Sequence, residues 1–429
     1  MKQLFQFLNG FPTKHRDIFI LVVAYALFAI GGSLYWAAIP ILSVDVFELN
    51  TFHASLLLAL IGVIYILVDG PTGVILDYIG YKKGAAISIL FAMITAVIAI
   101  LNPSLPLFIL SIVFFAFSWN SLTLAANAYI LYNAPKEIGG RAFGFYDSFY
   151  SFGVFIATLF IGLIAGWGFK GVGWFFLIPT GITFLLVVFF LKSEKRDYNQ
   201  NLRQALGKYW QGASQWRRGW QAMKEFRPIS WVKVFDGFVG YAANATIWLI
   251  IPLTLSTFAN PYLPEGFALG AFEIAGIFAV LAGGVLADRY SKKRLYLGFL
   301  FFAILTALAL GFAAGNFLLF IILAFVTTVL LGAADPVTDS MLVVVDEKHD
   351  KDGTIYGFMA ILADLGFIVG PIVGGLVYDS FALKGVFIFI AGLIFLNWLV
   401  AKILLRNFDE TKGASFPCKP GFCLGGLRK

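Results

Sequence analysis

The sequence has little charge and almost no cysteine. Asp, Glu, Lys and Arg make up 13% of its 429 residues, about half of the roughly 25% that soluble domains carry. Its two cysteines, Cys418 and Cys423, both lie in the C-terminal tail, and they are too few for a disulfide framework or a cysteine-based metal site. The three histidines fall at the ends of apolar segments or between them. This excludes a histidine relay or histidine metal site within those segments.

Long apolar runs are what the sequence has instead. Hydrophobic residues make up 60% of the chain, and apolar stretches of about 20 residues or more recur throughout it, each long enough to cross a hydrocarbon core of roughly 30 Å. The pattern predicts an all-α polytopic membrane protein. We expect twelve transmembrane helices, near residues 17–44, 52–78, 83–102, 106–133, 141–168, 171–192, 230–258, 266–288, 294–314, 316–345, 354–379 and 383–405.

A polar interval after the sixth expected helix divides the chain. We expect a six-helix bundle over residues 1–192, a basic cytoplasmic linker over 193–229, a second six-helix bundle over 230–406 and a cytoplasmic tail over 407–429. The linker interleaves Lys and Arg with three tryptophans, which is typical of an amphipathic helix lying on an anionic membrane surface. A solvated linker with some helical content is the alternative interpretation.

The distribution of Lys and Arg predicts the orientation. Of the 31 Lys and Arg residues, all but Lys170 and Lys384 fall on the side of the expected membrane that holds both termini. Because cytoplasmic loops carry the excess of Lys and Arg, both termini are predicted to be cytoplasmic. We expect a multi-pass protein of the plasma (inner) membrane.

Two parts of the chain repeat each other. The segment 73–83, GVILDYIGYKK, ends the second expected helix, and the segment 284–294, GVLADRYSKKR, ends the eighth, 211 residues later. Gly144 and Gly153 match Gly357 and Gly366 at an offset of 213 residues. Two halves in the same orientation are therefore internal repeats, which are common in transporter folds.

These residues resemble the major facilitator superfamily, whose loop signature reads G-x-x-x-D-R/K-x-G-R-K in each half. The resemblance implies two pseudo-symmetric six-helix bundles and a secondary transporter that works by alternating access. It also implies clusters that hold the cytoplasmic side shut, with Arg141 as the partner of Asp77. The alternative is that these residues are topology signals alone. The implied gate residues are Gly73, Asp77, Gly80, Lys82, Lys83, Arg141, Gly284, Asp288, Arg289, Lys292, Lys293 and Asp346.

A physical reason supports this loop pattern. Gly73 and Gly284 are expected to let neighbouring helices approach closely. Asp77 and Asp288 can face a helix N-terminus or a guanidinium group. The first copy departs from the family pattern, because Tyr78 and Tyr81 replace the usual basic residues.

The eleventh expected helix is rich in glycine. Its pattern looks like the motif that the family's drug–proton antiporters carry on the fifth helix, where this chain has a degraded copy. On the eleventh helix it predicts a bend and close packing, and it gives slight support to an exporter. The residues are Gly357, Gly366, Gly370, Pro371, Gly374 and Gly375.

Carboxylates fall inside the expected spans, whereas Lys and Arg lie at helix ends or in loops. An ionised carboxylate at the centre of a lone helix costs roughly 2.5–3.5 kcal/mol, so it must face a cavity, find a partner or take a proton. With no basic residue at comparable depth, we expect protonation or cation binding, the alternative being satisfied structural acids. Asp339 is expected to belong with the loop cluster, and a local cap for the Gly70-Pro71 kink is the alternative for Asp69. The candidate coupling residues are Asp364, Glu273, Asp236, Asp335, Asp147 and Asp69.

On the family's pattern, helices one, four, seven and ten line a substrate cavity. Aromatic faces near carboxylates suit organic cations through cation–π attraction, and they also suit sugars through stacking; packing is the plain alternative for any one aromatic residue. The candidate cavity residues are Tyr25, Tyr35, Trp36, Trp119, Asn120, Thr123, Asn127, Tyr241, Asn244 and Trp248.

The expected function is proton-coupled export of an amphipathic or cationic small molecule. A proton- or sodium-coupled importer of a neutral nutrient such as a sugar is the alternative, followed by a lipid-handling transporter or a receptor on the same scaffold. The chain has no P-loop, no HExxH pair and no nucleophile motif, so we expect no enzyme activity, no catalytic residues and no metal site. We expect an ion gradient instead of a cofactor, no nucleic-acid partner, and a monomer in the lipid bilayer.

Overall fold

The computed structural model describes residues 15–134, 139–193, 229–254, 266–287, 290–313, 315–346, 353–406 and 408, and the regular elements among them are all helices. By length and composition alone, ten helices in these ranges are apolar enough to cross a membrane. The helices are α2 (Arg16–Asp45), α3 (Thr51–Ile79), α4 (Tyr81–Ile100), α5 (Leu105–Asn133), α6 (Gly139–Ala165), α7 (Gly168–Phe190), α10 (Ile229–Leu253), α11 (Phe267–Ala287), α12 (Lys292–Ala313), α13 (Phe317–Asp346) and α14 (Gly353–Leu404).

The helix α14 contains two of the twelve expected helices. A kink at Ala382, with φ 52° and ψ −162°, separates them within one continuous run, where the sequence predicts an interruption between residues 379 and 383. The other boundaries lie within a few residues of the expected ones. The expected linker, most of the tail and both cysteines lie outside the described residues.

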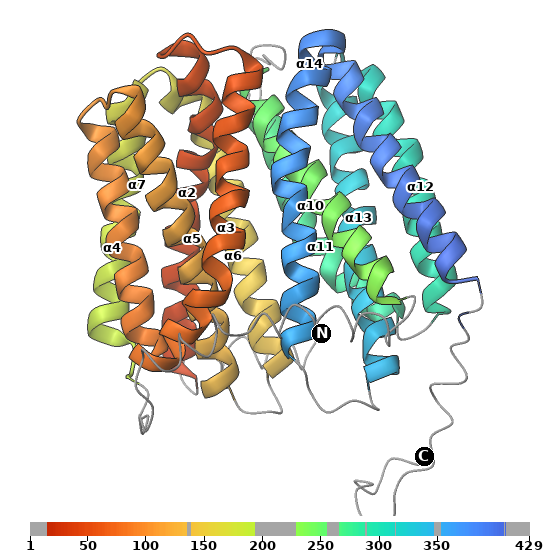
Figure 1. The fold of residues 1–429 in the computed structure, drawn as a ribbon, viewed down its shortest axis with the longest axis horizontal. Helices are drawn as coiled ribbons and strands as arrows, with labels where there is room; N and C mark the ends of the chain where they lie inside the picture. The colour runs from red at the N-terminus through yellow and green to blue at the C-terminus, as the bar shows by residue number, and fades with distance from the viewer. Residues whose placement is uncertain are drawn as a thin grey trace, which may run out of the picture.

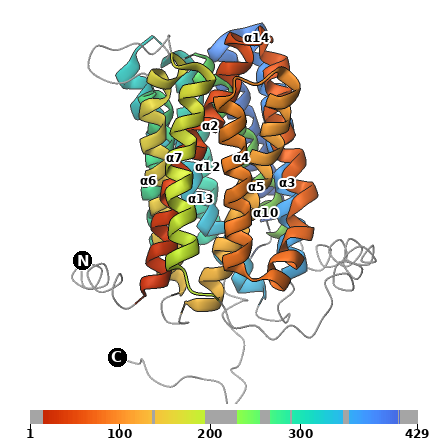
Figure 2. The same cartoon turned by 90° about the vertical axis from the view of Figure 1, so that its left-hand side faces the viewer.

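The helices form two bundles that stand side by side (Figure 1). In the first bundle α2 packs against α6 and α7, and in the second α10 packs along α14. The bundles meet along two seams, α3 with α14 and α6 with α11. The first bundle faces the viewer in Figure 2, where its helices run roughly along one axis. The predicted fold class of two six-helix bundles is confirmed.

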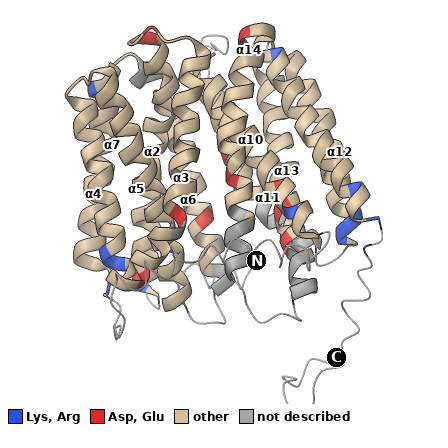
Figure 3. Ribbon diagram, in the orientation of Figure 1, with Lys and Arg blue, Asp and Glu red and all other residues tan. Residues whose placement is uncertain are grey.

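The start of α2 and the end of α14 lie at the same end of the molecule (Figure 1), which we name the terminal end; the opposite end is the far end. Lys and Arg lie near helix ends, mostly at the terminal end, whereas Asp and Glu also occur at mid-height (Figure 3). Because charge is costly inside a membrane, the acids at mid-height are the first place to look for a functional site.

Local sequence explains where two of the helices begin. The Asn50 side chain caps α3 by accepting a hydrogen bond from the backbone N–H of His53 at 2.9 Å, as expected for an N-cap residue. At the other end of α3, Gly80 has φ 90°, a conformation that favours glycine. Gly80 therefore joins α3 directly to α4 at the terminal end.

Candidate functional site

A cavity of about 430 Å³ lies between the two bundles, and we call it the central cavity. Side chains from α2, α3, α5 and α6 in the first bundle and from α10, α11 and α14 in the second line it. Its volume falls within the range of small-molecule sites, roughly 300–1,000 Å³. The aromatic side chains in its wall are Trp36, Tyr65, Trp119, Tyr150, Tyr241, Trp248 and Phe367.

Three carboxyl groups line the central cavity: Asp69 on α3, Glu273 on α11 and Asp364 on α14. The side chains of Asp69 and Asp364 lie close enough to interact across the seam between the bundles. Two carboxyl groups can share a hydrogen bond only if one of them carries a proton. A pair of this kind can hold one proton, and each half of the chain supplies one of its two acids.

Amide and indole groups hold two of these acids in place. Asn120 Nδ2 donates to Asp69 Oδ1, and Trp248 Nε1 donates to Glu273 Oε1 at 3.0 Å. Asp69 therefore contacts α5 and α14 rather than serving only as a local cap of the Gly70-Pro71 kink. Among the described residues that line the central cavity, none is Lys or Arg.

Trp36 stands at the centre of the aromatic wall. Its ring centroid lies 5.7 Å from that of Trp119, 6.2 Å from that of Trp248 and 6.1 Å from that of Phe367. These rings come from α2, α5, α10 and α14, so both bundles contribute. Offset and edge-to-face ring pairs of this spacing are favourable, and they give the cavity a rigid, π-rich surface.

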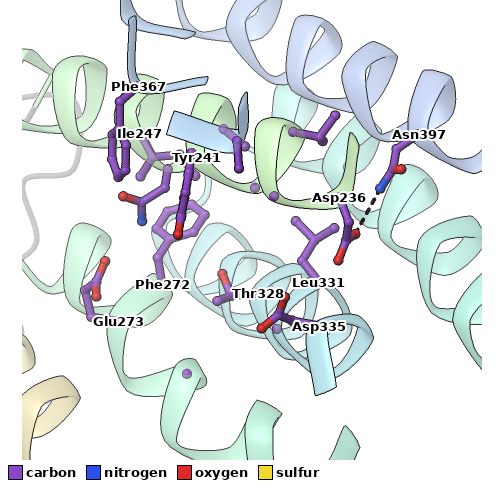
Figure 4. A pocket seen from close by; sticks show the side chains of 18 of the residues that line it. Asp236, Tyr241, Ile247, Phe272, Glu273, Thr328, Leu331, Asp335, Phe367 and Asn397 are labelled. Atoms are coloured by element: carbon purple, nitrogen blue, oxygen red, sulfur yellow. Dashed lines mark hydrogen bonds between the residues drawn. The ribbon is translucent and has the colours of Figure 1, made fainter. Parts of the chain in front are cut away.

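A larger cavity of about 660 Å³ adjoins the central one and lies mainly within the second bundle. We call it the second-bundle cavity (Figure 4). It shares Glu273, Tyr241 and Phe367 with the central cavity. It extends to Lys233 near the start of α10, so the two cavities together lead from mid-height toward the terminal end.

An ion-pair cluster lies at that end of the second-bundle cavity. Lys233 Nζ contacts Asp335 Oδ1 at 2.5 Å and Asp339 Oδ1 at 2.8 Å. The expectation that no basic residue lies at the depth of these acids is therefore wrong for Asp335, and Asp339 pairs with α10 instead of with the loop residues. The long Lys side chain explains the difference, because it reaches along the helix from a position near its end.

Asp236 is held by buried polar partners. Its Oδ1 accepts hydrogen bonds from the Tyr296 hydroxyl at 2.8 Å and from Asn397 Nδ2 at 3.0 Å. Tyr296 and Asn397 are almost fully buried. Figure 4 shows the bond from Asn397 beside the second-bundle cavity. Asp236 therefore ties α10 to α12 and α14.

Two kinds of candidate residue lie away from the cavities. Tyr35 is fully buried and its hydroxyl pairs with Ser111 Oγ at 2.6 Å, and the hydroxyl of Tyr25 pairs with that of Thr123 at 2.5 Å. Neither tyrosine is among the residues that line the central cavity, so the expectation that they do is wrong. Asp147 is exposed on α6 and lines neither cavity.

The other expected cavity residues do line the central cavity: Trp36, Trp119, Asn120, Thr123, Asn127, Tyr241, Asn244 and Trp248. Sequence reasoning missed Tyr65, Tyr150 and Phe367, which lie on helices two, five and eleven of the expected order. Tyr65 lies one helical turn from Asp69, and Phe367 three residues from Asp364. That spacing places each on the same helix face as an acid, a signal in the sequence that could have found them.

The first loop of the repeat makes contacts within its own bundle. The Tyr81 hydroxyl donates to Asp77 Oδ1 at 2.9 Å, so a tyrosine contacts the acid where the family pattern has basic residues. Lys82 Nζ donates to the carbonyl oxygen of Leu191 at 2.6 Å, next to the end of α7. In the second bundle Lys293 Nζ donates to the carbonyl of Arg406 at 3.0 Å.

Gly73 does not pack as expected. A Cβ atom at this position would have no heavy atom within 4 Å, so the prediction that Gly73 permits a close helix approach is wrong for this conformation. Asp288 and Arg289, and the side chains at positions 141, 284, 346 and 357, lie outside what the structure describes.

The glycines of α14 pack closely against α10. Cβ atoms at Gly366, Gly370 and Gly374 would clash with Phe238, Ala242 and Thr246, which lie one turn apart along α10. A Cβ atom at Gly375 would instead meet Ser55 of α3 at 3.1 Å. The expected close packing of this helix is therefore present, and its last contact reaches the other bundle.

The far end of the molecule is closed. Phe155 of α6 and Phe267 of α11 pack with ring centroids 5.8 Å apart, and Gly375 packs on Ser55 at the seam between α3 and α14. At the terminal end, Gly73 faces open space and the Asp335 side chain is 58% exposed. The two bundles are thus in contact at the far end, and the second-bundle cavity extends toward the terminal end.

The chain forms two six-helix bundles that meet at one end and enclose an acid-lined cavity between them. This is the architecture of a polytopic membrane carrier. The sequence model of the family described as "Major Facilitator Superfamily" matches residues 21–263 and 234–417 of this chain. The chain belongs to this superfamily, whose members are transporters.

Two relatives share about a quarter of their aligned residues with this chain. An uncharacterized MFS-type transporter of Methanocaldococcus jannaschii is 27% identical over 186 residues, which are 43% of this chain and 47% of that protein. The chain thus spans about half the length of that relative. The multidrug resistance protein MdtG of Dickeya zeae is 23% identical over 293 residues, 66% of this chain and 67% of that protein.

Solved structures share the fold. A bacterial homologue of the human lysosomal transporter Spinster, in an inward-facing and unoccupied conformation, matches with a TM-score of 0.68 and 16% identity over 92% of this chain and 98% of that one. The nucleoside transporter NupG matches with a TM-score of 0.67 and 17% identity over 91% of this chain and 99% of that one. At these identities the likeness concerns the fold alone.

Proposed function

We propose that this transporter exports amphipathic organic cations in exchange for protons, by alternating access. The observation that carries the proposal is the wall of the central cavity. Three carboxyl groups and seven aromatic rings line it, and no Lys or Arg stands among its described lining residues. A cation can replace a proton on such carboxyl groups, and aromatic faces attract it further.

The charge of the cavity argues against an anionic substrate. A small anion needs a Lys or Arg side chain as its partner, because an unpaired charge is costly to remove from water. Lys233, which lines the second-bundle cavity, is already paired with Asp335 and Asp339. The acids therefore favour a positively charged or protonated ligand.

The carboxyl pair formed by Asp69 and Asp364 supplies the coupling. Because the pair bridges α3 and α14, it holds its proton only while the two bundles are close at that height. A cation that binds there displaces the proton, and separation of the bundles exposes both groups. Exchange of a proton for a cation follows from this competition, without ATP or another cofactor.

The orientation and the direction of transport complete the proposal. The topology predicted from the sequence assigns all Lys and Arg residues but Lys170 and Lys384 to the side of the terminal end, so we place that end in the cytoplasm of a plasma (inner) membrane. The cavities are then open to the cytoplasm, where an exporter loads its substrate. The relatives named for multidrug resistance support export, and a monomer suffices because one chain forms the whole cavity.

Closure of the terminal end would complete the cycle. Gly73, which faces open space here, then gains a helix neighbour from the second bundle. Closing this end while the far end opens is the movement that alternating access requires. The glycines of α14 allow it to slide against α10 without losing contact.

Transport is tested in inverted membrane vesicles with a preset pH gradient. Adding an organic cation such as tetraphenylphosphonium should collapse the gradient only in vesicles that contain the protein. Asp364→Asn should reduce this response to the level of vesicles without the protein, whereas Asp379→Asn, an exposed acid on α14 outside both cavities, should leave it unchanged. Full coupled transport by Asp364→Asn would remove the carboxyl pair from the mechanism.

The same vesicles separate the competing functions. If transport of the cation depends on a sodium gradient instead of a pH gradient, sodium is the coupling ion and the substrate is still a cation. If the vesicles take up a nucleoside or a sugar and respond to no cation, the substrate belongs to that class and is not an organic cation. Lipid transport would be detected as movement of labelled lipid between the leaflets.

A further inference from the structure

Two hydrogen-bond donors in the wall of the central cavity have no partner. Trp36 Nε1 and the Tyr65 hydroxyl are buried atoms that lack a hydrogen bond to any described residue, and both residues line the cavity. Each residue is only 7% exposed. A buried donor without an acceptor costs roughly 1–3 kcal/mol, so the pair needs an explanation.

The rings that carry these two donors lie beside each other. The rings of Trp36 on α2 and Tyr65 on α3 are 6.5 Å apart between centroids and meet edge to face. Both pack on Phe367 of α14, at 6.1 Å and 5.9 Å. The two rings therefore belong to one small region of the cavity wall.

The same cavity shows how such a donor is satisfied. Trp248, whose ring packs against Trp36, donates its Nε1–H to Glu273 at 3.0 Å. Asp69, one helical turn from Tyr65, accepts from Asn120 and contacts Asp364. The cavity acids already have partners, and the donors of Trp36 and Tyr65 remain available for an acceptor from outside the protein.

We propose that the substrate is a cation that also carries an uncharged hydrogen-bond acceptor, such as a carbonyl or ether oxygen, which binds Trp36 Nε1–H and the Tyr65 hydroxyl. Its cationic centre lies at the carboxyl pair of Asp69 and Asp364, one helical turn from Tyr65. This inference rests on the proposed function, because it specifies the substrate of the same site. It divides organic cations into two classes that charge and size alone do not separate.

The chemistry predicts selectivity by the acceptor. A cation without an acceptor leaves both donors buried and unpaired, whereas a cation with an acceptor at the right position pairs them. Sites built to hydrogen-bond a ligand reject analogues that lack the matching group, because the buried polar groups are then unsatisfied. Aromatic packing and the carboxyl pair still attract both classes.

The test compares two cations of the same charge and similar size. Tetraphenylphosphonium has no acceptor, and its analogue with one acetyl group has a carbonyl oxygen. Binding is measured by equilibrium dialysis on purified protein in detergent, and transport is measured in the vesicles described above. We expect the acetyl analogue to bind about tenfold more tightly, as one good hydrogen bond predicts.

Substitutions then place this preference at the two donors. Tyr65→Phe removes one hydroxyl and Trp36→Phe removes the indole N–H; each should weaken binding of the acetyl analogue about five- to tenfold and leave tetraphenylphosphonium within about twofold. Tyr25→Phe, which removes a buried hydroxyl outside the cavity, is the matched control and should preserve the preference. If the larger change at Trp36 impairs folding, Tyr65→Phe alone is sufficient to test the acceptor site.

The outcomes separate this inference from the proposed function. Equal binding of both cations by the unaltered protein, or equal weakening of both by Tyr65→Phe, overturns the acceptor site even if cations are transported. Selective binding without any cation-dependent proton movement supports the acceptor site and overturns the transport proposal.

Discussion

Equivalent pairs of helices in the two bundles are held together by side chains of different chemistry. In the first bundle α2 meets α5 through the neutral hydroxyl pair of Tyr25 and Thr123. In the second bundle α10 meets α13 through Lys233 and its two carboxylates. Asp236 lies 211 residues after Tyr25, which is the offset between the two repeated loop segments. An acidic residue of the second bundle therefore corresponds to a neutral residue of the first.

Other contacts are the same in both bundles. Lys82 and Lys293, also 211 residues apart, each bind a backbone carbonyl near the end of the last helix of their own bundle. Gly153 packs against Ala26 as its counterpart Gly366 packs against Phe238. These shared contacts hold the helices of each bundle together.

The comparison separates scaffold from site. Contacts that occur in both bundles are those that any six-helix unit needs, whereas the differing polar groups of the second bundle line its cavity. The cavity of about 660 Å³ lies mainly within the second bundle and is lined by Lys233, Asp236 and Asp335, whereas the first bundle supplies mostly aromatic and amide side chains to the central cavity. We therefore expect substitutions to have unequal effects where the halves differ and equal effects where they agree.

The largest effect is expected at Asp236. Asp236→Ala removes the acceptor of two buried donors, on Tyr296 and Asn397, and should lower the free energy of unfolding by about 3 kcal/mol. The two donors lie 3.2 Å from each other, so they can pair in part, and this limits the loss. The measurement is denaturant unfolding of the purified protein in detergent.

Asp236→Asn, which keeps one oxygen acceptor, is the control and should cost less than half as much. Tyr25→Phe, at the equivalent position of the first bundle, should cost about 1 kcal/mol. If Asp236→Ala is as mild as Tyr25→Phe, the charged contact of the second bundle contributes no more than the neutral one.

The second prediction concerns the glycines of α14. Gly370→Ala places a Cβ atom against the backbone of Ala242 and should cost about 2 kcal/mol, because the helices must separate. The equivalent residue of the first bundle is Ala157, so the tight contact continues for more turns in the second bundle. Gly392→Ala, where a Cβ atom meets nothing within 4 Å, is the control, and the same unfolding measurement applies. An equal cost at both positions would contradict the packing argument.

The third prediction concerns the ion pairs of Lys233. Lys233→Met leaves Asp335 and Asp339 without their cation, and should cost about 1 kcal/mol, since both carboxylates are more than half exposed and water screens them. Adding Asp335→Asn and Asp339→Asn to this variant should restore most of the loss, measured by the same unfolding experiment. If the triple variant is as unstable as Lys233→Met, then packing of the Lys stem, and not its charge, is what stabilises α10 against α13.

The apolar runs were sufficient to predict the two bundles, because helix length and polarity are local properties of the chain. Contacts between the bundles are not local. Asp69 and Asp364 were each recognisable as acids within a span, but nothing in either segment indicates that they face each other. Their pairing depends on how α3 and α14 meet, which only the assembled fold determines.

Neighbouring residues show the same limit within one helix. Trp36 lines the central cavity and Tyr35 packs behind it, because successive residues of a helix point about 100° apart. An aromatic pair therefore marks a helix without showing which ring faces the cavity. Lys233 shows the opposite case, where a long side chain near a helix end reaches acids that its position alone would not assign to it.

The smallest effects are expected where the halves agree. Lys82→Met and Lys293→Met each remove a cation from the carbonyl end of a helix, an interaction worth about 0.5 kcal/mol at an exposed site. Both variants should lower the free energy of unfolding by similar amounts, and high salt should reduce the difference from the unaltered protein because it screens exposed charges. Lys83→Met, an exposed neighbour on the same helix, is the control. A loss at one position that exceeds the other by about 1 kcal/mol would show that the repeated lysines no longer serve the same purpose, and that the divergence between the bundles extends from the cavities to the scaffold.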